Sequence, residues 1–187
     1  MRQSDLDMTE HIFMAIDQLM AKDGLHNLSM HKIAKAAKIS PGTIYIYFKC
    51  KDELLEQFAR QVFTRFQRAL EKNYDASQNF FEQYRQMWWN VWHFLEENPN
   101  ILLNMHQYQS LPGFDRVIKE WDRSHWTLFC ERAQLAGELC HLPTNILFTL
   151  GLDSAIQIAW KKVYFKESLS TEILESVIRR TWCAMQK

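Results

Sequence analysis

The sequence predicts an all-α protein. Apolar residues recur every three to four positions along most of the 187-residue chain, and no stretch alternates as a useful strand would. Turn-forming residues are scarce, with 5 glycines and 4 prolines, whereas an all-β chain needs many. With 47% hydrophobic residues, the chain has enough apolar surface for a core. We expect about nine helices.

Three helices are expected first. One covers residues 4–23 and ends at Gly24, because a glycine commonly follows the last helical turn. The next begins after Ser29, a good N-cap. The third begins after Ser40, with Pro41 in the first helical position, where its missing N–H costs nothing. Together they predict a compact N-terminal unit.

Apolar stripes at helical spacing continue to the end of the chain. The Asn98-Pro99-Asn100 segment stops one helix, and Ser170 caps the last. The six remaining helices are expected at residues 51–72, 80–97, 100–108, 115–139, 144–165 and 171–185.

The charge is unevenly distributed. The whole chain is neutral, with 22 Lys and Arg against 22 Asp and Glu. Residues 24–51 nevertheless contain five lysines and no acidic residue, so 17 basic residues face all 22 acidic ones elsewhere. A basic segment on an acidic body is typical of a small DNA-reading module. Chance could also produce such a run.

The sequence gives little support for a membrane protein, a secreted protein or an enzyme. No run of residues approaches a membrane span, and the N-terminus lacks the apolar stretch of a signal peptide. The four cysteines are far apart in the sequence: Cys50, Cys130, Cys140 and Cys183. This spacing predicts reduced thiols in a cytoplasmic protein, with no disulfide and no metal site. No catalytic motif occurs, and adjacency of Cys140 and His141 does not place thiol and imidazole for proton transfer. We therefore expect neither an enzyme nor a cofactor.

Two short helices joined by a tight turn predict a helix-turn-helix in the basic segment. The major groove of DNA admits one helix, so an entering helix needs small or polar residues at its N-terminus. Gly42 and Thr43 meet that need.

The run Ser-Pro-Gly-Thr-Ile-Tyr-x-Tyr-Phe-x-x-Lys at residues 40–51, within residues 24–55, resembles the DNA-binding domain of TetR-type transcriptional regulators. The resemblance implies a helix-turn-helix DNA-binding domain at residues 1–50 and a six-helix ligand-binding and dimerisation domain at residues 51–187. It also implies a homodimer that reads a palindromic operator in double-stranded DNA. Most members are repressors released by a small molecule.

Four positions depart from the family pattern. Leu25 replaces the usual aromatic residue after the glycine and is a smaller core residue. Lys38 replaces the usual turn glycine, at a cost of about 1–2 kcal/mol if its backbone is left-handed. Cys50 is a poor N-cap for the helix that follows. Ile46 replaces a basic or amide residue, which favours apolar contact with thymine methyl groups over bidentate hydrogen bonds.

The resemblance assigns phosphate contacts to Tyr47 and Lys51, and Thr43 is the best candidate for a base-edge contact. Lys51 could instead be a solvated lysine paired with Glu53, and Tyr45 could be mostly core. The predicted DNA-binding residues are Ser29, Lys38, Ser40, Pro41, Gly42, Thr43, Tyr45, Ile46, Tyr47 and Lys51.

The helix at residues 80–97 is unusually aromatic, more so than one packing face needs. An aromatic-lined pocket fits an apolar or aromatic effector, and Asp153 would suit a cationic one. Each aromatic residue could instead belong to the ordinary hydrophobic core. Asp153 could instead form a hydrogen bond to a neighbouring helix. The predicted ligand-binding residues are Tyr84, Trp88, Trp89, Trp92, His93, His106, Trp126 and Asp153.

The last two helices are the predicted dimer surface. Small residues spaced three to four apart allow helices to approach closely, and an apolar strip would be exposed in a bare monomer. By resemblance this surface forms half of an intermolecular four-helix bundle. The predicted interface residues are Gly151, Ser154, Ala155, Ile173, Val177, Ile178 and Trp182.

Two alternatives to a ligand-released repressor stay open. One is a helix-turn-helix DNA-binding protein regulated by a protein partner, without a small-molecule inducer. The other is a helical oligomerisation module with no role in DNA binding.

Overall fold

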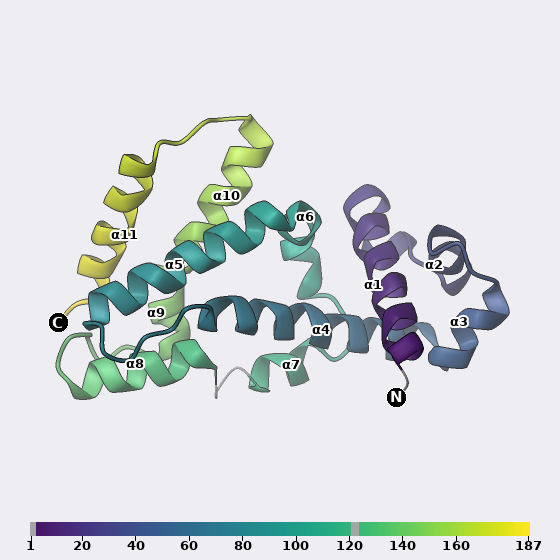
Figure 1. The fold of residues 1–187 in the computed structure, drawn as a ribbon, viewed down its shortest axis with the longest axis horizontal. Coiled ribbons are helices and arrows are strands. Elements are labelled where there is room, and N and C mark those ends of the chain that lie inside the picture. The colour runs from purple at the N-terminus through teal and green to yellow at the C-terminus, as the bar shows by residue number, and fades with distance from the viewer. Residues whose placement is uncertain (1–2, 121–123) are drawn as a thin grey trace. The chain divides into compact units, whose positions relative to one another are not determined.

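The computed structural model describes residues 3–120 and 124–187, and they form an all-α fold (Figure 1). The described residues contain one 3-10 helix, η1 at Leu25–Asn27. They also contain eleven α-helices: α1 (Gln3–Asp23), α2 (Met30–Ala36), α3 (Pro41–Tyr47), α4 (Lys51–Glu71), α5 (Phe80–Glu97), α6 (Pro99–Tyr108), α7 (Phe114–Glu120), α8 (His125–Leu135), α9 (Thr144–Leu150), α10 (Asp153–Phe165) and α11 (Thr171–Met185).

The chain divides into two compact units. The N-terminal unit comprises residues 1–63 and 103–118, and the C-terminal unit comprises residues 64–102 and 119–187. The division falls inside α4, inside α6 and near the end of α7, so each of these helices contributes to both units. A boundary at residue 50 is therefore not where the structure divides.

The core of the N-terminal unit joins its first three helices, which Figure 1 shows grouped together. Ile12 and Ile16 of α1, Ile33 of α2 and Ile44 of α3 are fully buried. Their burial follows from the helical spacing of apolar residues, because each helix presents one stripe to the others.

The later segments of this unit extend the same core. The ring of Phe58 on α4 lies 5.8 Å from that of Phe13 on α1 and 6.2 Å from that of Tyr108 on α6. Ring pairs at such distances add to the energy of apolar burial. Phe58 and Tyr108 are themselves 2–3% exposed, which explains why residues 51–63 and 103–118 belong with the helix-turn-helix.

Two amides of α6 hold α1 and η1 in place, and we call Asn104 and Gln107 the α6 amide pair. Asn104 is fully buried and donates to the carbonyl oxygen and the Oδ1 of Asp17, at 2.9 and 2.8 Å. Gln107 accepts the backbone N–H of Leu25 at 2.7 Å and donates to the Met20 carbonyl at 3.2 Å. These bonds satisfy polar groups that would otherwise be costly to bury.

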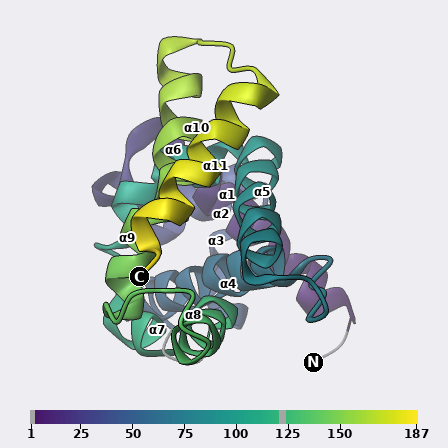
Figure 2. The same cartoon turned by 90° about the vertical axis from the view of Figure 1, so that its left-hand side faces the viewer.

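The C-terminal unit is built around α5, which contacts α10 and α11. Figure 1 and Figure 2 show α10 and α11 running in opposite directions alongside it. Tyr84, Trp88 and Val91 of α5 are completely buried, as are Trp126 and Phe129 of α8.

Two predicted long helices are each divided. In place of one helix at residues 115–139, the structure has α7 and then α8, which Ser124 caps by accepting the N–H of Thr127. In place of one helix at residues 144–165, α9 ends at Leu150 with Gly151 as its C-cap, and α10 begins at Asp153. A side chain at Gly151 would put its Cβ 2.8 Å from the Met185 sulfur, so glycine at this position leaves room for the end of α11. No helix within residues 3–120 and 124–187 is long and apolar enough to cross a membrane.

Candidate nucleic-acid interface

The candidate recognition helix, α3, is anchored on one face and free on the other. Ile44 and Phe48 are 0% and 1% exposed, which fixes the helix to the core of the N-terminal unit. Tyr45 is 56% exposed and Ile46 79%. Tyr45 is therefore not a core residue, and both side chains are available to a partner outside the unit.

Ser40 organises the N-terminus of α3. Its hydroxyl accepts the backbone N–H of Thr43 at 3.0 Å and lies 2.8 Å from the Thr43 hydroxyl. This N-cap satisfies one of the unpaired N–H groups of the first turn and fixes the Thr43 side chain. The predicted start of the helix at Pro41 is confirmed.

The turn between α2 and α3 contains the predicted left-handed residue. Lys38 has φ 54°, a conformation that a side chain disfavours by about 1–2 kcal/mol. The Ile39 N–H donates to the Ala34 carbonyl at 3.0 Å and closes the turn. The Lys38 side chain itself is exposed.

Gly42 is exposed in the first turn of α3, and its backbone is not left-handed. A Cβ added there would meet only the Ser40 hydroxyl, at an ordinary 3.7 Å. Nothing within the protein therefore requires glycine at this position.

Lys51 starts α4 and is half-buried. Its expected alternative partner, Glu53, is engaged elsewhere: it accepts the backbone N–H of Lys49 at 2.8 Å. In the part of the chain that the structure describes, no ion pair includes Lys51. Its ammonium group is thus available for another anion. Tyr47 is half-buried, with its ring 6.5 Å from that of Phe48.

The remaining basic residues of the segment surround these groups. Ser29 caps α2 by accepting the N–H of Lys32 at 3.2 Å, and the Lys32 ammonium donates to the Asn27 carbonyl at 3.0 Å. Lys35 and Lys49 are exposed, like Lys32 and Lys38. The ion pairs found among the described residues involve none of these lysines, so the local positive charge is not neutralised.

Most of the predicted ligand-binding aromatics form the core of the C-terminal unit. Tyr84, Trp88, Trp92 and Trp126 are 0–3% exposed. Burial raises the pKa of the Tyr84 hydroxyl, which bonds Thr181 at 2.6 Å. The Trp88 N–H donates to the Ser154 hydroxyl at 2.8 Å, and that of Trp126 to the Thr144 carbonyl at 2.9 Å. Their polar atoms are thus satisfied within the chain.

The other predicted ligand residues are spread out. The Trp89 N–H donates to Glu175 at 2.9 Å, and its ring stacks on His93. Asp153 is half-buried and accepts a long hydrogen bond from Gln157 at 3.4 Å. His106 is exposed and belongs to the N-terminal unit, apart from the other seven.

Sequence reasoning missed the ion pair that organises this region. Arg85 donates to both oxygens of Glu175, at 2.5–3.0 Å. Bonds from Arg85 are the main cause that holds the pKa of the Glu175 carboxyl below its ordinary value, with the Trp89 N–H contributing. The pair joins residues 90 positions apart, so no local pattern reveals it.

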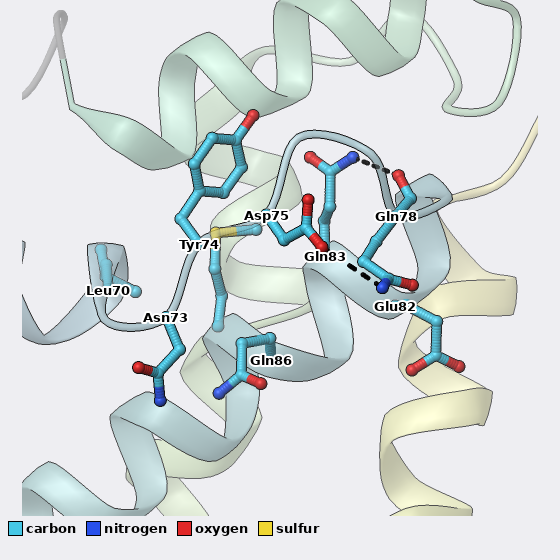
Figure 3. A pocket seen from close by; sticks show the side chains of 9 residues that line it. Leu70, Asn73, Tyr74, Asp75, Gln78, Glu82, Gln83 and Gln86 are labelled. Carbon is cyan, nitrogen blue, oxygen red and sulfur yellow. Dashed lines mark hydrogen bonds between the residues drawn. The ribbon is translucent and has the colours of Figure 1, made fainter.

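Two hollows open in the C-terminal unit. One has a volume of about 290 Å³ and is lined mainly by amide and carboxylate side chains, including Asp75, Glu82 and Gln83 (Figure 3). The other, of about 490 Å³, lies between α4 and α5 and includes His93. Nowhere in the described parts of the chain do three or more His, Cys, Asp or Glu side chains form a group that could hold a metal ion.

The predicted dimer surface needs a correction. Gly151, Ala155, Ile178 and Trp182 are buried, and Ser154 is half-buried with its hydroxyl taken by the Trp88 N–H. Their own chain covers several of them: Met185 of α11 lies against Gly151, and rings of α5 and α8 pack on Trp182. Residues buried in this way leave little surface for a partner. Of the seven, Ile173, at 52% exposed, and Val177, half-buried, remain accessible.

Family models match both parts of the chain. Residues 12–58 match the bacterial regulatory proteins of the tetR family, and residues 79–186 match the tetracyclin repressor-like C-terminal domain. The second match alone covers more than half of the chain.

Solved structures of similar proteins point to the same family. A TetR-family transcriptional regulator from Haemophilus influenzae is 54% identical over the whole of both chains, with a TM-score of 0.93. A putative TetR-family regulator from Vibrio parahaemolyticus is 29% identical, with a TM-score of 0.82 over 95% of this chain and 98% of its own. FadR from Bacillus subtilis, solved in complex with stearoyl-CoA, shares the fold at 17% identity, with a TM-score of 0.73 over 95% of this chain and 99% of its own. The chain belongs to the TetR family of helix-turn-helix transcriptional regulators and is not an enzyme.

Proposed function

We propose that the protein is a homodimeric repressor that reads a palindromic operator in the cytoplasm and is released by a small molecule. The observation that carries the DNA-reading part is the geometry of α3. Its inner face is buried at Ile44 and Phe48, while Tyr45 and Ile46 project into solvent from a surface with uncompensated lysines. Exposed apolar and aromatic groups on a cationic helix-turn-helix suit the major groove.

We assign distinct roles to the residues of this surface. Lys51 and Tyr47 contact phosphates, together with Ser29 and Lys38, and so set the register of α3. Thr43 reads a base edge, and Ile46 contacts thymine methyl groups. The remaining contacts come from the first two turns of α3: Ser40, Pro41, Gly42 and Tyr45.

Dimerisation uses the outer surface of α10 and α11. In addition to Ile173 and Val177 on α11, two aromatic residues of α10 are exposed, Tyr164 at 65% and Phe165 at 57%. The ring of Trp160 stacks on that of Tyr164, with the ring centroids 4.8 Å apart. Apolar side chains concentrated on one pair of helices favour burial against a second copy.

A small-molecule effector is supported by fold, since FadR holds stearoyl-CoA within the same architecture. The aromatic core of the C-terminal unit offers an apolar environment for such a ligand. Entry requires the core to open, because its tryptophan and tyrosine polar atoms already have partners.

The test is binding to the region upstream of the protein's own gene, measured by gel shift and fluorescence anisotropy. We expect one dimer per palindromic site and much weaker binding to unrelated DNA of equal length. Equal affinity for both DNAs would contradict operator reading, and a helical oligomerisation module would bind neither.

Tryptophan fluorescence separates a small-molecule effector from a protein partner. All seven tryptophans follow residue 87, so a ligand in the C-terminal unit should quench them saturably and release the operator at the same concentrations. A regulator controlled by a protein partner would show neither response to a small-molecule library.

A further inference from the structure

A basic groove lies on the C-terminal unit between α4 and α5. This α4–α5 groove is the hollow of about 490 Å³ described above, a volume typical of small-molecule sites. Its lining residues are Arg65, Arg68, Ala69, Glu71 and Lys72 from α4 and its C-terminal end, and Asn90, His93, Phe94, Glu97 and Asn98 from α5 and its C-terminal end.

Three cations of the groove form a stripe at the C-terminal end of α4. Arg65 and Arg68 are three residues apart and share one face of the helix, and Lys72 directly follows its last residue, Glu71. From Arg65 to Lys72 the chain advances by about 10 Å. Arg68 and Lys72 are exposed and Arg65 is half-buried.

These cations are not paired with the acidic residues beside them. Throughout residues 3–120 and 124–187, no ion pair includes any of the three, and none includes Glu71 or Glu97. The stripe stands out because the chain outside residues 24–51 has an acidic excess, whereas residues 64–72 hold three basic residues and one acidic one.

Hydrogen bonds link the two walls of the groove. Asn90 is 6% exposed and donates to the carbonyls of Leu70 and Lys72, at 3.3 and 2.7 Å, which ties the end of α4 to α5. The Arg65 guanidinium donates to the Asn98 side chain and lies 5.9 Å from the centre of the Phe94 ring. A cation already oriented by its neighbours loses little freedom when a ligand arrives.

We propose that the α4–α5 groove binds a small polyanion, a molecule with two or more phosphate or carboxylate groups. A stripe of three cations about 10 Å long can contact two anionic groups at once. Arg65 and Arg68 supply planar donors for oxyanions, and Lys72 supplies a point charge. The groove makes no use of the residues of α3, so the site stands even if the operator proposal fails.

The experiment is calorimetric titration of the full chain with inorganic pyrophosphate and, separately, with citrate. We expect saturable binding at one site per chain, several-fold tighter than for inorganic phosphate, which has only one anionic group. Tighter binding of pyrophosphate identifies a phosphate ligand class, and tighter binding of citrate identifies a carboxylate class. No saturable binding of either probe overturns the proposal.

Matched variants locate the site. Arg68→Ala and Lys72→Gln should each weaken the preferred probe about tenfold, because each removes one charge-assisted contact. Arg60→Ala is the control: it removes a cation from the same helix outside the groove, where Arg60 faces Glu56 at 3.9 Å. Equal weakening by Arg60→Ala would show a general charge effect and refute a defined site.

Arg68 also lies in the last turn of α4, where any cation interacts favourably with the helix dipole. If that were its whole role, Arg68→Ala would lower thermal stability but leave pyrophosphate and citrate binding unchanged. This result would overturn the proposal, whereas weaker binding at unchanged helical content supports it.

Discussion

Replacing Gly42 with alanine should separate the stability of the protein from its affinity for DNA. The new Cβ would lie 3.7 Å from the Ser40 hydroxyl, and apart from the adjacent residues and the backbone of its own helix it would meet no other heavy atom within 4 Å among the described residues. The protein has room for this methyl group, so any loss of binding must come from the DNA side.

Gly42→Ala should raise the stability of the protein and lower its affinity for the operator. Alanine is favoured over glycine within a helix by up to about 1 kcal/mol, which corresponds to a rise in Tm of about 2–4 °C for a chain of this size. On DNA the same methyl group occupies the space through which the backbone of α3 approaches. Overpacking a close contact costs about 1–3 kcal/mol, or about 5- to 150-fold in affinity per recognition helix.

The assay is operator binding by anisotropy, beside thermal unfolding followed by circular dichroism. Gly42→Ser provides a graded comparison, because its larger side chain should weaken binding further. A Gly42→Ala protein that is more stable and binds the operator as tightly as the wild type would refute the close approach of α3.

Four further changes test separate parts of the structure. Lys51→Ala should weaken binding to all DNA sequences and reduce the slope of log affinity against log salt by about one, as loss of one phosphate contact requires; an unchanged slope would remove this role. Thr43→Ala should change the preferred base at one operator position while non-specific affinity stays constant, which a binding-site selection would reveal. Gln107→Met should lower the free energy of unfolding in urea by about 1–3 kcal/mol, because the Leu25 N–H loses its acceptor; no loss would show that this bond contributes nothing. The depressed pKa of Glu175 stabilises the fold above its ordinary value of 4.5, and this contribution is lost as pH falls through the lower folded-state pKa. Glu175→Gln should remove that part of the pH dependence of stability below about pH 4.5, and an unchanged acid profile would contradict it.

The recognition helix could be predicted from sequence because its signals are local. Ser40 caps it, Pro41 starts it, and Ile44 and Phe48 lie four residues apart on the face that the structure buries. Each of these properties depends on residues within one or two turns.

The C-terminal unit was less predictable because periodicity identifies an apolar face but not its partner. Ile178 and Trp182 belong to a stripe that a second copy could have covered, yet their own chain buries them. Small residues at Gly151 and Ala155 likewise indicated close approach of helices without saying which ones. The close contact between Gly151 and Met185 joins positions 34 residues apart, so no short window of sequence contains it.

The α6 amide pair was hidden for the same reason. Asn104 and Gln107 are polar residues on a largely apolar helix, and their acceptors and donors lie more than 80 residues earlier. Only the fold shows that these amides complete the helix-turn-helix unit.

The division of the chain inside α4 and α6 has a consequence for dissection of the protein. A fragment ending at residue 50 would lack Phe58, whose ring packs on Phe13, and Tyr108, whose ring packs on Phe58, together with the α6 amide pair. Such a fragment should expose apolar surface and aggregate or remain partly unfolded. Because three helices, α4, α6 and α7, contribute residues to both units, neither unit can be excised without cutting a helix. We therefore expect calorimetry of the intact chain to record one cooperative unfolding event.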